Sequence, residues 1–141
     1  MIGGGILWEE ARMLDKSRMV GFVPTIDYEA AREFYVEKLG FTFVSLDQFA
    51  LVVLAGEQKI RITKMPNFSP LQGTILGWEV EKIEEVVEWL EQRGVATEKY
   101  PFAQDQKLGI WTAPGGDKVA WFKDPAGNIL GISQHARGRA E

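Results

Sequence analysis

The chain has 141 residues, of which 45% are hydrophobic and 26% are charged, as in an ordinary globular domain. Its net charge of −4 argues against a nucleic-acid-binding protein, which would carry a basic face. The absence of cysteine and the single histidine, His135, exclude disulfides, thiolate chemistry and metal sites built on several imidazoles.

The N-terminal region gives no sign of a targeting or membrane segment. No apolar run approaches the roughly 18 to 20 residues that a membrane-spanning helix needs, and no basic region precedes an apolar core. We therefore expect a cytoplasmic protein with neither membrane nor nucleic-acid partners. Residues 1–18 are expected to form an N-terminal extension, in which Leu7, Ala11 and Leu14 follow helical spacing.

From residue 19 the pattern predicts a strand, a helix and three further strands. The apolar segment 19–26 predicts the first strand, and Asp27 is a good N-cap for the helix after it. Gly40 suits the left-handed end of that helix. Its buried stripe is expected to comprise Ala31, Phe34, Tyr35 and Leu39. The three strands are expected at 41–46, 49–55 and 59–64.

The same order of elements returns after residues 65–73, a linker rich in turn-forming residues. A strand at 74–80 precedes a helix that Gly94 ends, and Phe34 then corresponds to Trp89 and Gly40 to Gly94. Trp78 and Trp89 are expected in the core. The buried positions of the second helix should be Ile83, Val86, Val87 and Leu90, and strands are expected at 95–100, 118–123 and 129–133.

The segment from Asp124 to Asn128 predicts a tight hairpin turn. Asp124 can accept hydrogen bonds from nearby backbone donors, Pro125 fixes φ, and Gly127 can take a positive φ. The turn therefore joins the last two strands of the second repeat.

The segments VPTIDYEAAREFYVEKLGF (23–41) and GGDKVAWFKDPAGNILGISQ (115–134) together resemble the vicinal oxygen chelate superfamily. That group includes glyoxalase I, extradiol dioxygenases, fosfomycin-modifying enzymes and bleomycin-resistance proteins. The resemblance covers one domain, residues 19–134, with modules at 19–64 and 74–134. It implies an α+β fold of two tandem βαβββ modules, which form a curled sheet with a cleft and carry their helices on the outer face. It also implies a homodimer.

Metalloenzymes of this family place their ligands on the first and last strands of each module. In this chain those positions fall on Val20, Arg61, Ile75 and Gly131. Arg61 is a permanent cation that would repel a metal, and the other side chains offer no lone pair. A register slipped by one residue reaches Gly21, Thr74, Leu130 or Ile132, none of them a strong ligand. We therefore expect no metal and no cofactor. A further departure is Lys82, where the family often has an aspartate opening the second helix.

Strand alternation predicts which side chains face the cleft. One side of two strands is expected to pack under the helices, through Ile60, Ile62, Leu76, Trp78 and Val80. The residues that alternate with these along the strands then face the cleft. The candidate ligand-binding residues are then Phe22, Arg61, Thr63, Ile75, Glu79 and Gly131, with Trp111 and Trp121 from the hairpin at the cleft mouth.

Several of these residues have more than one interpretation. Arg61 pairs with Glu79, clamps a carboxylate or phosphate of a ligand, or is simply exposed if the predicted strand alternation is wrong. Trp111 and Trp121 either pack at a strand end or form an aromatic wall for a flat ligand. His135 is expected in a solvent-exposed tail, residues 135–141.

Four alternative functions are consistent with these features of the sequence. The first is a metal-independent protein that binds a small organic molecule in its cleft, as bleomycin-resistance proteins do. The alternative is a metal-dependent lyase, isomerase or dioxygenase with non-standard ligands. A structural module with a filled cleft is the third, and a metal-free enzyme that uses Arg61 and Glu79 in acid–base chemistry is the fourth.

Overall fold

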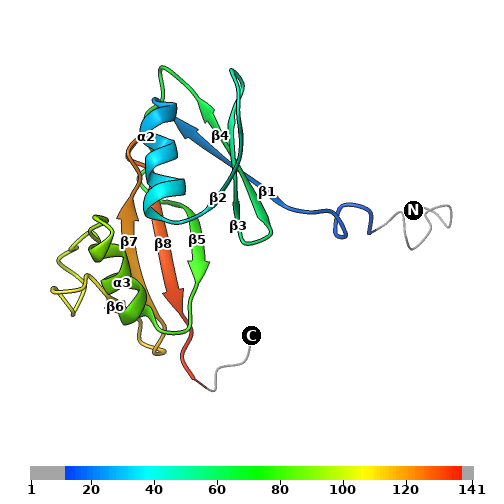
Figure 1. The fold of residues 1–141 in the computed structure, drawn as a ribbon. Coiled ribbons are helices and arrows are strands. Elements are labelled where there is room, and N and C mark those ends of the chain that lie inside the picture. Colours follow the sequence, from blue (N-terminus) through cyan, green and yellow to red (C-terminus); the bar gives the residue numbers. More distant parts are fainter. Residues whose placement is uncertain (1–11, 138–141) are drawn as a thin grey trace.

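The computed structural model describes residues 12–137, which form two tandem modules (Figure 1). The first module comprises β1 (Val20–Thr25), α2 (Tyr28–Arg32), η1 (Glu33–Lys38), β2 (Thr42–Leu46), β3 (Leu51–Ala55) and β4 (Gln58–Lys64). The second comprises β5 (Thr74–Glu79), α3 (Ile83–Gln92), β6 (Trp111–Thr112), β7 (Lys118–Lys123) and β8 (Ile129–Gln134). The order of elements confirms the predicted repeat. Leu7 and Ala11, which the expected N-terminal helix includes, lie outside the described residues.

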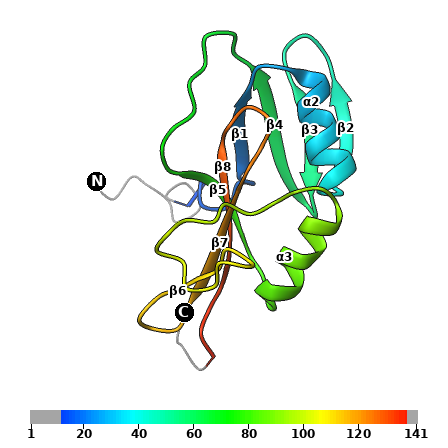
Figure 2. The same cartoon turned by 90° about the vertical axis from the view of Figure 1, so that its left-hand side faces the viewer.

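Each module builds a four-stranded sheet with the same topology. The strand orders are β1-β4-β3-β2 and β5-β8-β7-β6. In both sheets the first strand of the module pairs in parallel with the last, and the other pairings are antiparallel. Figure 2 shows α2 and α3 on the same side of the molecule. The fold is therefore the predicted two-module α+β arrangement.

The first helix begins as predicted and changes its hydrogen bonding halfway. The Asp27 carboxylate accepts a hydrogen bond from the Glu29 backbone N–H at 2.9 Å. The chain then widens into the π-helix η1, where the Leu39 N–H donates to the Phe34 carbonyl at 2.9 Å. Gly40 follows with a φ of 80°. The predicted buried positions Ala31, Phe34, Tyr35 and Leu39 are all buried.

The side chain that caps the second helix comes from another element, the last strand. Lys82 provides no side-chain hydrogen bond, and the Gln134 side chain at the end of β8 accepts from the Ile83 N–H at 2.8 Å. The prediction that Trp89 is a core residue is wrong, because Trp89 is 40% exposed. No helix within residues 12–137 is long and apolar enough to cross a membrane.

The predicted strand at 95–100 is also wrong. Thr97 makes only an isolated antiparallel bridge to Phe122 of β7. Pro101 follows shortly afterwards and has no N–H with which to continue a ladder. The chain leaves the sheet there and pairs with β7 again only at Trp111–Thr112. The loop between these two pairings positions aromatic side chains that the site uses.

The hairpin turn after β7 forms as predicted. The Asp124 carboxylate accepts hydrogen bonds from the backbone N–H groups of Ala126 and Asn128, each at 3.0 Å, and Gly127 has a φ of 92°.

The same turn joins the two modules. The Tyr35 hydroxyl of η1 donates to Asp124 at 2.6 Å, and the Asn128 amide donates to the Pro24 carbonyl of β1 at 2.8 Å. Burial raises the pKa of Tyr35 far above its usual range, and the charge of Asp124 and its hydrogen bond add to this. A single hydrophobic core contains side chains from both modules.

Candidate functional site

The open face of the first sheet carries one group of the predicted site residues. Phe22 pairs with Arg61 in the parallel ladder of β1 and β4, so both side chains lie on the same side. Thr63 follows Arg61 by two residues in β4, so its side chain lies on the same side of the sheet. Ile60 and Ile62 are buried on the other side, which faces the core. We call the side with Phe22, Arg61 and Thr63 the first-sheet face.

The open face of the second sheet carries another group. Gly131 of β8 pairs with both Gly77 of β5 and Trp121 of β7, and Ser133 pairs with Glu79. These five residues define the second-sheet face. The opposite parity packs against the core, as predicted for Leu76 and Trp78.

A hollow of about 290 Å³ lies in the second-sheet face. Three predicted site residues line it: Glu79, Trp121 and Gly131. The full lining comprises Thr74, Gly77, Trp78, Glu79, Val119, Trp121, Gly131, Ile132 and Ser133. Phe22, Arg61 and Thr63 belong to the other sheet and are not part of this lining. We call this cavity the second-sheet hollow.

Glycines form the floor of the second-sheet hollow because the strands approach closely there. A Cβ on Gly77 would lie 3.0 Å from the backbone oxygen of Gly131. A Cβ on Gly131 would lie 3.3 Å from the Thr74 side chain and 3.6 Å from the Trp121 ring. A side chain at position 77 therefore needs the backbone of β8 to shift by a few tenths of an ångström, whereas one at position 131 first meets the Thr74 side chain. Gly131 is one of the four positions where the resemblance implies a metal ligand.

Ile75 departs from the simple alternation that placed it in the cleft. The pairing of β5 with β8 shifts register between Thr74 and Leu76. Thr74 consequently lines the second-sheet hollow, while Ile75 packs against the core. Ile75 also lines a wider groove of about 710 Å³ along the seam between the two sheets, with Gly21 and Lys59 from the first module.

A cluster of four aromatic rings, which we call the aromatic wall, adjoins the second-sheet hollow through Trp121, whereas the predicted site residue Trp111 is not part of the hollow's lining. The ring centroids of Trp111 and Trp121 are 6.4 Å apart and their planes differ by 33°. Phe102 packs edge-on to both indoles, and Tyr100 lies 5.5 Å from Trp121. No sequence pattern singled out Tyr100 and Phe102, because they come from the irregular loop before β6. Phe102 is 57% exposed, so the wall presents apolar surface to water.

The polar rim of the second-sheet hollow contains the single histidine of the chain. The His135 Nε2 lies 2.5 Å from a Glu79 carboxylate oxygen, and its Nδ1 lies 3.6 Å from Asp117. Asp117 also accepts a hydrogen bond from the Ala136 N–H at 2.8 Å. His135 is thus exposed as predicted, but it is fixed to the rim. Glu79 pairs with His135 and makes no ion pair with Arg61 in the described part of the chain.

The electrostatic neighbour of Arg61 is Asp47, in the turn between β2 and β3. Backbone hydrogen bonds from Phe49 and Ala50 lower the pKa of the Asp47 carboxyl, and the Arg61 charge lowers it further. Arg61 makes no hydrogen bond or ion pair with another side chain among residues 12–137. The N–H groups of its guanidinium therefore remain available to donate hydrogen bonds. Phe22, beside it in the ladder, is 70% exposed.

The residues at the four expected ligand positions do not fit a metal ion. Val20, Ile75 and Gly131 carry no donor atom, and Arg61 is cationic. Across residues 12–137, no cluster of three or more His, Asp or Glu side chains is placed to hold a metal. The second-sheet hollow instead offers the Trp121 indole and the Glu79 carboxylate, and the Arg61 guanidinium lies on the first-sheet face.

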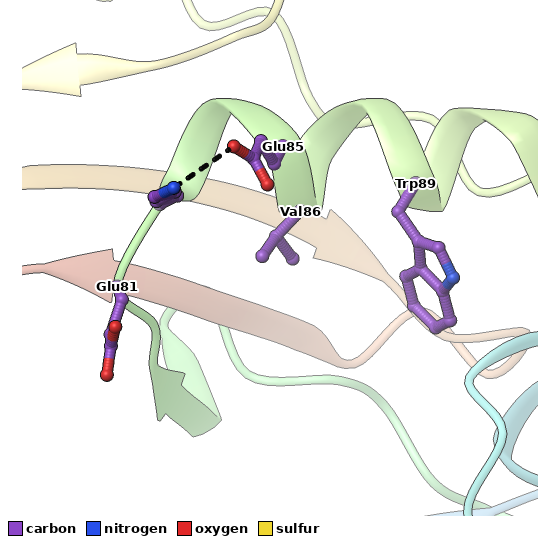
Figure 3. Close-up of a pocket in the computed structure, with 5 residues that line it drawn as sticks. Glu81, Glu85, Val86 and Trp89 are labelled. Atoms are coloured by element: carbon purple, nitrogen blue, oxygen red, sulfur yellow. Dashed lines mark ion pairs between the residues drawn. The ribbon is translucent and has the colours of Figure 1, made fainter.

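A separate hollow of about 400 Å³ lies beside the first turns of α3 (Figure 3). Val86 and Trp89 project from one side of the helix, and Lys82 pairs with Glu85 at 3.7 Å. Both charged side chains of this pair are more than two thirds exposed. This hollow contains none of the predicted site residues, and its polar groups face solvent. We place the functional site in the second-sheet hollow instead.

Comparison with protein families gives one match over most of the chain. Residues 18–132 match the family described as the Glyoxalase/Bleomycin resistance protein/Dioxygenase superfamily. No curated protein matches the chain.

Solved structures share the fold. A glyoxalase family protein from Enterococcus faecalis is 26% identical, with a TM-score of 0.69, and the match covers 86% of this chain and 99% of that one. The antibiotic binding protein TnmS3 from Streptomyces sp. CB03234 is 23% identical, with a TM-score of 0.61 and coverage of 86% and 97%. A bleomycin-binding protein complexed with bleomycin is 19% identical, with a TM-score of 0.64 and coverage of 86% and 100%.

Proposed function

Because the chain belongs to the Glyoxalase/Bleomycin resistance protein/Dioxygenase superfamily, we propose that it is a metal-independent protein that binds a small organic molecule. The observation that carries this proposal is the second-sheet hollow. The Trp121 indole, two glycines and the Glu79 carboxylate line it, and an apolar concavity with a few placed polar groups is the usual form of a small-molecule site.

Metal independence rests on the chemistry of the ligand positions. A catalytic metal of the usual kind needs imidazole, thiolate or converging carboxylate ligands. Val20, Arg61 and Gly131 supply none of these. The printed descriptions of two structural neighbours, an antibiotic binding protein and a bleomycin-binding protein, support a binding function on this fold.

We also propose that the protein acts as a homodimer in which the first-sheet face of one subunit covers the second-sheet hollow of its partner. The hollow alone, at about 290 Å³, is slightly smaller than a typical ligand site of roughly 300 to 1,000 Å³. The first-sheet face leaves Phe22 exposed beside Arg61, which has no ion-pair partner among the described residues. Joining the two faces would shield Phe22 and bring the Arg61 guanidinium to the ligand.

Native mass spectrometry of freshly purified, untagged protein tests both parts of this proposal. We expect a dimer whose mass contains no metal ion, and a co-purified ligand would add an organic mass. One tightly held metal ion per subunit would contradict metal independence and favour a metal-dependent lyase, isomerase or dioxygenase. A monomer would contradict the composite site.

A further inference from the structure

A second apolar cavity, of about 290 Å³, lies on the side of the second sheet that α3 covers. It is bounded by α3, by the strands β5, β7 and β8, and by the segment that follows η1. We call it the helix-side cavity. Trp78 and Ile132 line both this cavity and the second-sheet hollow, so β5 and β8 form the wall between the two.

The helix α3 supplies one wall of the helix-side cavity through Val86, Trp89 and Leu90. These residues lie three and four positions apart and therefore share one face of the helix. Figure 3 shows Val86 and Trp89 projecting from the same side of α3. Leu90 is buried and Trp89 is 40% exposed, so the wall runs from the core to the surface.

The end of the π-helix η1 supplies the facing wall through Leu39 and Phe41. Their backbone N–H groups donate to the carbonyls of Phe34 and Tyr35 at 2.9 and 3.0 Å, which fixes both positions. The ring centroid of Phe41 lies 5.5 Å from that of Trp78. This wall therefore joins the first module to β5.

Arg93 at the end of α3 holds the two walls together. Its Nη2 donates to the Glu37 carbonyl at 2.8 Å, and its Nε donates to the Lys38 carbonyl. Its guanidinium carbon lies 4.9 Å from the centroid of the Trp89 ring. Because these contacts connect α3 to η1, the helix-side cavity is formed without a ligand.

The chemistry of the helix-side cavity favours an uncharged occupant. Glu79 is the only charged residue in its lining, and the Glu79 carboxylate is bound to His135 at 2.5 Å. An ordered water needs two to four polar partners, which an apolar lining does not provide. A cavity of roughly 150 Å³ lined by Leu, Ile and Phe stays dry and holds benzene. The helix-side cavity, at about 290 Å³, therefore has room for a larger ring system.

We propose that the helix-side cavity is a second ligand site, which binds an uncharged apolar molecule of about the size of two fused rings. The molecule lies between α3 and the segment after η1, and it covers the exposed part of Trp89. This site is separate from the second-sheet hollow, so the proposal does not depend on the function proposed above.

Methyl NMR spectroscopy of the full chain, with naphthalene as the probe, tests this proposal. Naphthalene is expected to shift the methyl signals of Leu39, Val86 and Leu90 and to leave unchanged those of Val119, which lines only the second-sheet hollow. Naphthalene-2-sulfonate has the same rings and a charge. It is expected to shift the same signals with an affinity at least about tenfold weaker, because a charge is costly to bury in apolar surroundings.

The other outcomes overturn the proposal in distinguishable ways. Shifts confined to Val119 would overturn the second site and support the proposed function of the second-sheet hollow. No shift at either cavity would overturn the second site, and native mass spectrometry would still test the proposed function. Equal affinities of the two probes would overturn the restriction to uncharged molecules. Signals of Val86 and Leu90 that change on dilution of the free protein would show that a second copy covers the cavity instead.

Substitutions in the α3 wall test the location. Val86→Phe fills the helix-side cavity and is expected to weaken naphthalene at least about tenfold. Val44→Phe is the matched control, because Val44 is 48% exposed on β2 and does not line the cavity. Trp89→Ala, which removes part of the same wall, should also weaken naphthalene and serves if Val86→Phe fails to fold, which circular dichroism would reveal. Unchanged naphthalene affinity in a folded Val86→Phe or Trp89→Ala protein would overturn the proposal.

Discussion

At the scale of single residues, the close approach of β5 and β8 limits which side chains fit at the base of the second-sheet hollow. Gly131 lies between the Thr74 side chain and the Trp121 ring, and Gly77 faces the Gly131 carbonyl. The aromatic wall therefore stands above a floor from which no donor atom projects. The position that carries a metal ligand in related enzymes serves here to let strands and an indole pack together.

Gly77→Ala is expected to destabilise the protein by about 1 to 3 kcal/mol, because the new methyl group would meet the Gly131 carbonyl at 3.0 Å. Gly73→Ala is the matched control, since nothing lies within 4 Å of a Cβ at that position. Chemical denaturation measures both free energies of unfolding. Equal stabilities of the two variants would contradict the close-packing explanation.

Tyr35 is the residue whose ionisation depends most on folding. Its pKa is raised in the folded state, so its contribution to stability is fully present below the ordinary tyrosine pKa of 10.0. The contribution is lost as pH rises above that value, because the unfolded chain then releases a proton that the folded chain retains.

The free energy of unfolding of the native protein should therefore fall above about pH 10, with a slope that Tyr35→Phe reduces. At neutral pH the same substitution is expected to cost about 1 to 3 kcal/mol, because Asp124 loses a buried hydrogen bond. Denaturation between pH 7 and pH 11 measures both effects. An identical slope in the native protein and the variant would contradict the prediction.

At the scale of elements, the two helices diverge although their sequences repeat. η1 packs at the junction of the modules, where the Tyr35 hydroxyl reaches Asp124 of the second module. Trp89, the counterpart of the buried Phe34, is 40% exposed, and the Arg93 guanidinium carbon lies 4.9 Å from the centroid of its ring. The same pattern of apolar residues is therefore buried in one module and partly exposed in the other.

The start of α3 depends on a residue at the other end of its module. Gln134→Ala removes the acceptor of the Ile83 N–H and is expected to lower stability by about 1 kcal/mol, as the loss of an N-cap does. In thermal denaturation this corresponds to about 3 °C for a domain of this size. Gln72→Ala in the exposed linker should leave the melting temperature unchanged. A native melting temperature for Gln134→Ala would show that Ile83 needs no partner.

At the scale of the whole molecule, the two open faces belong to different sheets. The second-sheet hollow contains the aromatic and acidic side chains, and the first-sheet face contains Phe22 and Arg61. Phe22 is 70% exposed on the first-sheet face, which the proposed homodimer would cover.

Phe22→Glu is expected to weaken the proposed dimer, because it places a charge at the centre of the first-sheet face. Leu71→Glu is the matched control, since Leu71 is equally exposed, at 70%, but belongs to the linker between the modules. Light scattering after size-exclusion chromatography gives the mass of each variant. A Phe22→Glu protein that remains dimeric would contradict this assignment of the interface.

The local sequence was sufficient for most elements of the fold. Apolar segments predicted seven of the strands, Asp27 and Gly40 marked the first helix, and Asp124 and Gly127 marked the last hairpin. These features depend on residues close together in the chain, which is why they could be predicted. The resemblance of segments 23–41 and 115–134 also indicated the family.

Only the tertiary structure decided how these elements share the site. The register shift at Thr74 moved Ile75 out of the second-sheet hollow, and the split pairing of β7 brought Phe102 to the wall. His135 reached Glu79 across 56 residues of sequence. The sequence by itself determined the order of strands and helices and removed the donors from the metal positions. It did not determine the aromatic wall and charged rim, because those arise from contacts between segments that are far apart in the chain.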